Sequence, residues 1–228
     1  TVDALLDKLV RGDVLVTDIR FIEGWTFRQM RDAIDAHPDL AHDTKGVDEA
    51  ALLGMIGAPE RRAEGLFFPD TYTFSPGASD VDLYRQAYRK QQQALRAAWD
   101  ARDPSLPYRS PYEALVMASI VEKETGHPMD RDKVAAVFVN RLKRGMMLQS
   151  DPTTIYGMGE RFDGNLRKRD LQADTAYNTY TRAGLPPTPI ALPGKASIEA
   201  ALKPADVPAL YFVARGDGTS EFSDDLAS

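Results

Sequence analysis

Two glutamates at the end of an apolar segment are the residues best placed for chemistry. The segment runs from Ser110 to Gly126 and reads SPYEALVMASIVEKETG. An apolar stretch of this kind predicts a buried helix, and helical spacing puts Glu122 on the same face as Ala118 and Ser119. A carboxyl beside apolar neighbours and the negative end of a helix dipole is favoured in its protonated form. Glu122 is therefore the candidate general acid, able to protonate a leaving oxygen.

The residues alone leave other interpretations open. Glu-Lys-Glu in the last turn of a helix is commonly a solvated cluster, and Asp151 in Ser-Asp-Pro is commonly a helix N-cap. A two-carboxylate hydrolase needs a second acid at about 5 Å or at about 6.5–9.5 Å, and the candidates are Asp151 and Glu64. A lytic mechanism needs only Glu122, because the 6-hydroxyl of the sugar itself attacks the anomeric carbon. A third interpretation is a binding or scaffold protein without catalytic activity, in which the Tyr- and Pro-rich stretch from 177 to 194 is the binding surface.

The ends of the helix that carries Glu122 are marked in the sequence. Ser110 is a good N-cap, Pro111 suits the first helical position, and Glu113 completes a capping-box pattern. Gly126 is placed to end the helix. Glu124 falls on a different face from Glu122, so the two acids are predicted to have different neighbours.

The other elements that must position these acids follow from periodicity and turn signals. A turn is predicted at Glu23-Gly24, and five prolines exclude regular structure from Tyr177 to Gly194, a length that favours a functional loop. One helical turn is predicted at 153–156, inside the polar stretch LQSDPTTIYG. Strands are predicted at 13–21, 71–74, 210–214 and 221–223, and helices at 2–11, 27–36, 44–57, 80–102, 110–126, 130–144, 166–175 and 196–202.

Composition narrows the functional class. The chain has 228 residues and a net charge of −6, and no basic stripe with interleaved aromatics is visible, which argues against a nucleic-acid binder. There is no cysteine, and the three histidines have no metal-ligand spacing, so we expect no metal and no cofactor. No apolar run reaches the roughly 18 residues of a membrane helix. The chain begins at Thr1, so a preceding signal or anchor is compatible with the sequence.

Six blocks, in order, resemble one family. They are EGLFFPDTYTF, ASIVEKETG, VAAVFVNRL, LQSDPTTIYG, YNTYTRAGLPPTPIALPG and YFVARGDGT. Together they span about residues 13–223 and are similar to the endolytic murein transglycosylase (YceG-like) family. The resemblance implies a lytic transglycosylase that cuts nascent peptidoglycan strands between N-acetylmuramic acid and N-acetylglucosamine. Such an enzyme leaves 1,6-anhydro ends and terminates glycan elongation.

The resemblance also implies roles for particular residues. The catalytic acid of the family falls on Glu122, the first Glu of the EKET block. The implied substrate-binding residues are Glu124, Gln149, Ser150, Asp151, Thr154, Tyr156, Asn178, Thr179, Tyr180 and Glu64. The chain departs from the family pattern at Leu192, where Asn is common, and at Ser220, where His is common, so neither position is given an essential role.

The implied fold is α+β, with a small LysM-like α+β module at residues 1–62. A mainly helical catalytic domain with short β-strands follows at residues 63–228. The resemblance further implies a single inner-membrane anchor, a periplasmic catalytic part, and partnership with peptidoglycan synthases (penicillin-binding proteins). No helix for that anchor is visible in the chain, so anchoring is an expectation from the resemblance alone.

Overall fold

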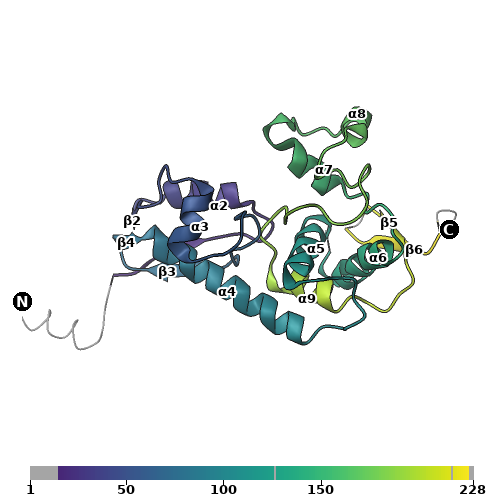
Figure 1. Ribbon diagram of the computed structural model, residues 1–228, viewed down its shortest axis with the longest axis horizontal. Helices are drawn as coiled ribbons and strands as arrows, with labels where there is room; N and C mark the ends of the chain where they lie inside the picture. Colours follow the sequence, from purple (N-terminus) through teal and green to yellow (C-terminus); the bar gives the residue numbers. More distant parts are fainter. Residues whose placement is uncertain (1–14, 126, 217, 226–228) are drawn as a thin grey trace, which may run out of the picture.

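Helices are the main regular structure of the molecule, with short strands at both ends. The structure is a computed structural model and describes residues 15–125, 127–216 and 218–225. Figure 1 shows the long helix α4 running from the N-terminal elements beneath the molecule to a helical group at the other end. The helices are α2 Phe27–Asp35, α3 Glu49–Ile56, α4 Asp80–Asp100, α5 Pro111–Glu124, α6 Arg131–Lys143, α7 Asp151–Met158, α8 Lys168–Gln172 and α9 Lys195–Leu202. This mainly helical arrangement with short strands confirms the α+β class.

Within the described residues, the strands form three two-stranded sheets. β1 (Thr17–Arg20) pairs antiparallel with β3 (Thr71–Phe74), and β2 (Leu40–Ala41) pairs parallel with β4 (Ala78–Ser79). Both pairs join residues on the two sides of position 62, where the sequence places a domain boundary. That division stays a prediction, and the helix predicted at 2–11 lies outside the described residues.

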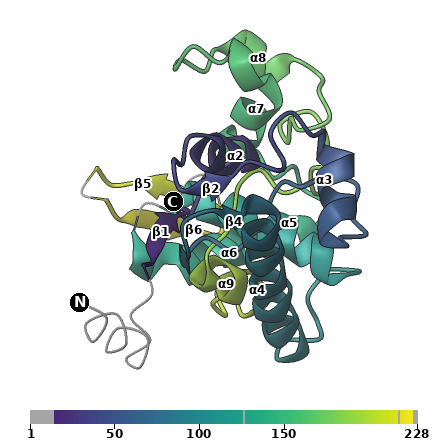
Figure 2. The same cartoon turned by 90° about the vertical axis from the view of Figure 1, so that its left-hand side faces the viewer.

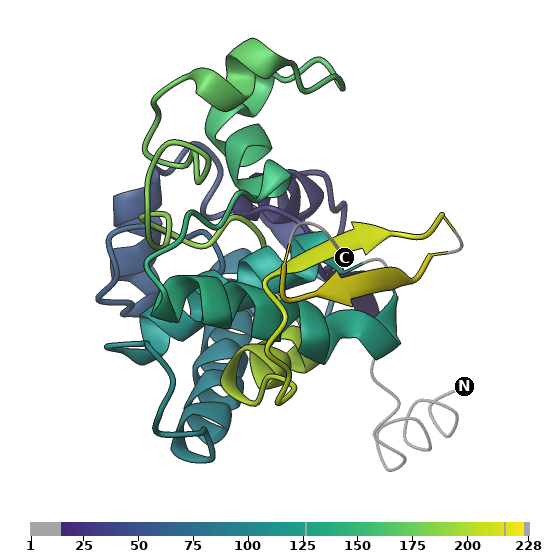
Figure 3. The same ribbon diagram turned by 90° about the vertical axis from the view of Figure 1, so that its right-hand side faces the viewer.

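The third sheet is formed by the strands predicted at 210–214 and 221–223. β5 (Tyr211–Ala214) pairs antiparallel with β6 (Ser220–Ser223). Figure 3 shows this hairpin projecting to one side of the helical group. The helices α7 and α8 form an arm on another side, above the rest of the molecule in Figures 1 and 2.

The helix that carries both candidate acids is the centre of the core. Every residue of α5 from 114 to 121 is buried, as its apolar sequence predicts, and the helix packs mainly against α9 and α6. Ser110 accepts a hydrogen bond from the Glu113 backbone N–H at 3.3 Å, which confirms the N-cap. In a capping box the Glu113 carboxylate would accept from the Ser110 N–H. It accepts instead from the N–H of Arg109, one residue earlier, at 2.7 Å, so the predicted capping box was wrong in this detail.

A buried arginine on α6 holds the chain that follows it. Arg141 donates through Nε to the Leu210 carbonyl at 2.6 Å and through Nη1 to the Leu148 carbonyl at 2.8 Å. A buried cation needs such acceptors because desolvation of its charge is costly. Arg141 therefore joins α6 to the approach of β5 and to the polar stretch that begins α7.

The N-terminal elements are fastened to α4 by one buried carboxylate. Asp80, the first residue of α4, accepts from the backbone N–H groups of Asp43 and Thr44, both at 3.1 Å. It also accepts from the Thr44 hydroxyl at 2.5 Å. The negative charge of Asp80 at the start of α4 also interacts favourably with the positive end of the helix dipole. The contact fixes the loop between β2 and α3 against the long helix.

Most element boundaries agree with the sequence to within a few residues. The helix at 151–158 is longer than the single turn predicted at 153–156. It can begin before Pro152 because proline is tolerated in the first turn of a helix. Short 3-10 turns precede α6 at Pro128–Asp130 and follow α7 at Gly159–Arg161. The segment from 177 to 194 has no helix or strand, as its prolines predict.

Candidate active site

Glu122 lies at the end of α5, partly exposed, with one oxygen bound to the backbone. Its Oε2 accepts a hydrogen bond from the Gly194 N–H at 2.9 Å. Gly194 is the last residue of the proline-rich segment and the N-cap residue of α9. The carboxyl group is thus held by a main-chain donor at the meeting point of two helices, and such charge-assisted bonds are stronger than neutral ones.

The proline-rich segment covers the small-residue face of α5. The Ile190 N–H donates to the Ser119 hydroxyl at 3.0 Å, and that hydroxyl donates to the Val116 carbonyl at 2.7 Å. The small side chains of this face, Ala118 and Ser119, leave room for a close neighbour. They admit the protein's own chain, because Ser119 is fully buried beneath it. Access to Glu122 is therefore from the end of the helix.

Glu124 faces a different part of the protein, as its helical position predicts. Its Oε1 accepts from the Ser150 hydroxyl at 2.7 Å. Burial raises the pKa of Glu124 to about 6, with a further contribution from the charge of Asp151, while Ser150 and Arg141 oppose the shift. The LQSDPT stretch therefore contacts Glu124, whereas the end of the proline-rich segment contacts Glu122.

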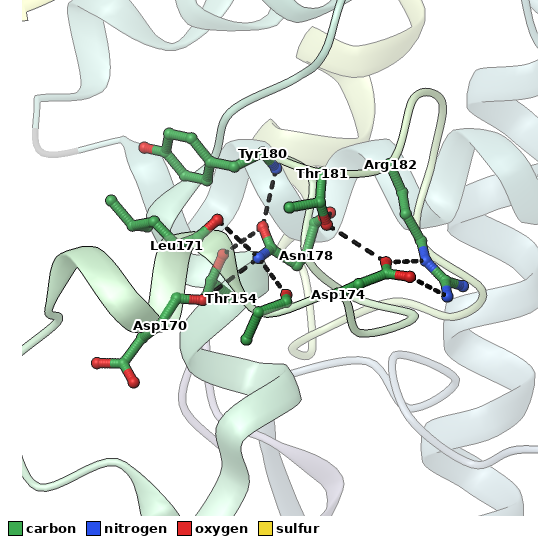
Figure 4. A network of polar contacts seen from close by, with 9 residues as sticks. Thr154, Asp170, Leu171, Asp174, Asn178, Tyr180, Thr181 and Arg182 are labelled. Atoms are coloured by element: carbon green, nitrogen blue, oxygen red, sulfur yellow. Dashed lines mark hydrogen bonds and ion pairs between the residues drawn. The ribbon is translucent and has the colours of Figure 1, made fainter.

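A fully buried asparagine organises the wall beside Glu124. Figure 4 shows the Asn178 side chain among backbone groups of α8 and its own loop. Its Nδ2 donates to the carbonyls of Leu171 and Ala173 at 3.0 and 2.7 Å, and its Oδ1 accepts from the Tyr180 N–H at 2.9 Å. The Thr154 hydroxyl of α7 also donates to Oδ1, at 3.3 Å. Asn178 therefore joins the arm of α7 and α8 to the 177–194 segment.

Replacing Asn178 with Ala should lower the free energy of unfolding by about 2–3 kcal/mol, because several buried backbone groups lose their partner. Urea unfolding measures the change. Asn165→Ala, at an exposed asparagine in the same arm, is the matched control and should change stability by less than about 0.5 kcal/mol. Equal stabilities of the two variants would contradict this account of the wall.

The predicted substrate-binding residues divide into a buried set and an accessible set. Ser150, Thr154, Asn178 and Thr179 are buried, with their polar side chains bonded inside the protein. Their structural role is to hold the wall, and direct contact with a ligand stays a prediction for them.

The accessible set lies on the rim of this wall. The Tyr180 hydroxyl donates to the Asp151 carboxylate, which is exposed at the start of α7. Gln149 is exposed and has a φ of 55°, an unusual conformation outside glycine. Its N–H donates to the Thr179 carbonyl at 3.1 Å. Strained residues of this kind often mark functional sites, so Gln149 remains a good candidate for ligand contact.

A separate cleft of about 800 Å³ opens around Glu64. Glu64 is 7% exposed and accepts from the Phe27 N–H at 2.9 Å and the Tyr156 hydroxyl at 3.0 Å. Burial raises the pKa of Glu64 to about 7, against these two hydrogen bonds. The cleft is lined by Thr26, Phe27, Arg28, Gln29, Glu49, Arg62, Glu64, Ile155, Tyr156, Gly159, Glu160, Phe162, Tyr177 and Thr188, and Glu122 is not among them.

One acidic residue beside Glu122 was missed by reasoning from the sequence. Glu23 was assigned to a turn only, yet its carboxylate lies against Gly194. The Glu-Gly pair marks Glu23 as a turn residue but does not indicate its contact with Gly194. The two residues lie far apart in the chain, so no local pattern reports that contact.

Within the described residues, the structure has neither a cluster that could bind a metal ion nor a helix that could span a membrane. None of their His, Asp and Glu side chains gather in a group of three or more that could hold a metal ion. In the same part of the chain, no helix is both long and apolar enough to span a membrane.

Comparison with known proteins gives consistent matches. The YceG-like family matches residues 1–228. The endolytic murein transglycosylase of Bacillus subtilis (strain 168) is 40% identical over 163 residues, which are 72% of this chain and 45% of the relative. The protein of that name from Streptococcus pneumoniae serotype 2 is 32% identical over 158 residues, 67% of this chain and 28% of the relative. The chain thus spans less than half the length of these curated relatives.

A solved structure is also similar. The crystal structure of a YceG-like protein from Listeria monocytogenes superposes with a TM-score of 0.74 at 30% sequence identity. The alignment covers 99% of this chain and 79% of that one. The similarity therefore extends over both ends of the fold described above.

Proposed function

This chain belongs to the YceG-like family, and on that premise we propose that it carries the catalytic part of an endolytic peptidoglycan lytic transglycosylase. The relatives named endolytic murein transglycosylase support the reaction class. The observation that carries the proposal is Glu122, a partly exposed carboxyl at the end of a buried helix, oriented by the Gly194 N–H.

In the proposed reaction Glu122 acts first as an acid and then as a base. It gives its proton to the glycosidic oxygen between N-acetylmuramic acid and N-acetylglucosamine, and the bond from that oxygen to the anomeric carbon breaks. The carboxylate then takes the proton of the 6-hydroxyl, whose oxygen bonds to the same carbon to form a 1,6-anhydro ring. Glu122 ends protonated again, and no water is consumed. The Gly194 N–H stabilises the carboxylate that exists between the two steps.

The accessible residues of the wall are proposed to bind the glycan. Gln149, Asp151 and Tyr180 offer amide, carboxylate and phenol groups on its rim, and aromatic faces suit the apolar faces of sugars. The cleft at Glu64 and Tyr156 is a further candidate surface for the strand or its peptide. The buried residues of the wall contribute by fixing the positions of these groups.

The cellular role follows as a further part of the proposal. Cleavage within nascent strands would end glycan elongation, beside peptidoglycan synthases of the penicillin-binding protein class. The family resemblance supports a periplasmic catalytic part tethered by a single inner-membrane helix, which would lie outside the residues described here.

The mass of the products tests the reaction directly. Purified protein is incubated with nascent glycan strands, and the fragments are analysed by mass spectrometry. A lytic reaction gives fragments whose masses sum to that of the substrate, with anhydro ends, whereas hydrolysis adds one water for each cut. Water-containing products would support a muramidase-type hydrolase, and binding without shortening would support a scaffold protein.

A further inference from the structure

The cleft around Glu64 has one more carboxylate than it has guanidinium groups. Its charged residues are Arg28, Arg62, Glu49, Glu64 and Glu160. Arg28 forms an ion pair with Glu160. Arg62 forms one with Glu49, at 3.4 Å. In the part of the chain that the structure describes, Glu64 is therefore the carboxylate of this cleft that has no cationic partner.

The Glu64 carboxylate is held in place by two neutral donors. The Phe27 N–H bonds Oε1 at 2.9 Å and the Tyr156 hydroxyl bonds Oε2 at 3.0 Å. A carboxylate oxygen can accept more than one hydrogen bond, so both oxygens can take a further donor. Burial disfavours the charge of Glu64, and the like charge of Glu49 adds to this effect. A ligand that brings a cation would supply the opposite charge that the site lacks.

Aromatic side chains form the walls beside this carboxylate. The ring centroids of Tyr156 and Tyr177 are 5.0 Å apart, and Phe27 and Phe162 also line the cleft. The Tyr177 hydroxyl is bonded to the Thr188 hydroxyl at 2.8 Å, which holds its ring in place. Apolar contact and cation–π attraction suit such walls to an aliphatic chain that ends in an ammonium group. A ligand with that chain and that charge would match both features of the cleft.

The cleft lies within reach of a strand bound at Glu122. A Cβ placed on Gly24 would lie 3.8 Å from Cγ of Glu122. Phe27, whose N–H bonds Glu64, follows three residues later, and three residues of chain span at most about 11 Å. A stem peptide of three extended residues covers about the same distance before its side chain is counted. A peptide that branches from the glycan at Glu122 can therefore place a side chain in the cleft.

We propose that Glu64 binds the free side-chain ammonium of a peptidoglycan stem peptide, whose methylene chain lies against the rings of Tyr156 and Tyr177. This inference rests on the proposed function, because it names the part of that substrate that enters the cleft. A cross-link formed through this amine converts it to a neutral amide, which cannot pair with the carboxylate. Glu64 thus favours strands whose stems have not yet accepted a cross-link, as those of nascent strands have not.

The test is the binding of short uncross-linked glycan strands that carry their stem peptides. The protein carries Glu122→Gln so that the strands are not cut, and the pH is 8, where primary amines are protonated and Glu64 is ionised. Acetylating the amines of the same strands should weaken binding about 10- to 100-fold, the range for a hydrogen bond to a charged group. This comparison needs no change at position 64.

Adding Glu64→Gln should abolish the difference between the two kinds of strand. Free-amine strands should then bind about as weakly as acetylated ones. The glutamine side chain fits the site, because its oxygen can accept the Phe27 N–H while its amide group donates to the Tyr156 hydroxyl. Adding Glu199→Gln instead changes an exposed carboxylate of α9 outside the cleft, and the full difference should remain.

The outcomes separate this inference from the proposed function. Equal binding of free-amine and acetylated strands to the protein that retains Glu64 would overturn the inference. Equal weakening of both kinds of strand by Glu64→Gln would also overturn it, because the residue would then have no specific contact with the amine. Failure of the wild-type protein to release anhydro-ended fragments would instead remove the proposed function. An amine-dependent difference in binding would stand in that case, because no strand is cut in its measurement.

Discussion

Glu122→Gln is expected to lower the release of anhydro-ended glycan fragments by about 100- to 10,000-fold, the usual contribution of a general acid. An amide cannot give a proton to the glycosidic oxygen or take one from the 6-hydroxyl. Its oxygen can still accept the Gly194 N–H, which now bonds Oε2 at 2.9 Å. The melting temperature should therefore stay close to that of the wild type.

Fragment release and thermal melting must be measured on the same preparations. Glu124→Gln is the informative comparison, because it changes the neighbouring carboxyl, which bonds Ser150. We expect it to retain far more activity than Glu122→Gln. A folded Glu122→Gln protein with wild-type activity would remove Glu122 as the acid, and an inactive Glu124→Gln with an active Glu122→Gln would reverse the assignment.

The second large effect is on stability, which should fall as pH rises from about 4.5 to about 7. Glu64 has a usual pKa of 4.5 in the unfolded chain and about 7 in the folded protein. In this window the folded state binds more protons than the unfolded state, so raising the pH favours unfolding. The difference corresponds to about 3 kcal/mol. From about pH 8 upward both states are ionised at this residue and the loss is complete.

Glu64→Gln should remove most of this pH dependence, because an amide stays neutral while its oxygen still accepts a hydrogen bond. Urea unfolding at pH 5 and at pH 8 measures the difference for each protein. Part of the fall in stability with rising pH should persist in Glu64→Gln. The pKa of Glu124 is also raised, to about 6, and contributes in the same direction. Glu160→Gln, which changes an exposed carboxyl on the same cleft, should behave as wild type. An unchanged slope in Glu64→Gln would contradict the assignment.

The sequence predicted best where the signal is local. The cap at Ser110 and the apolar run that follows it predict both ends of α5 to within a few residues. The sequence Gly216-Asp217-Gly218 between the two C-terminal strands is an equally local turn signal. Helical spacing alone also separated Glu122 from Glu124, and the structure gives them different partners.

The surroundings of Glu122 could not be predicted in this way. The proline-rich segment has no periodicity, so nothing in it indicates that it covers Ser119 or ends at the carboxyl of Glu122. Glu23 is brought there by contacts between segments far apart in the chain. The family resemblance transferred roles to Asn178 and Thr154 without showing that both are buried. Burial and long-range docking depend on the complete fold, and a list of motifs does not contain them.

The strand pairs that cross position 62 have a consequence for how the molecule unfolds. β1 and β2 have their partners in β3 and β4, which lie beyond that position. The part before position 62 cannot unfold without breaking its strand hydrogen bonds to the part after it. The two parts should therefore unfold cooperatively. A fragment beginning at residue 63 would have unpaired strand edges, which promote aggregation. The two parts are better treated as one thermodynamic unit, and their separate expression is expected to give poorly soluble chains.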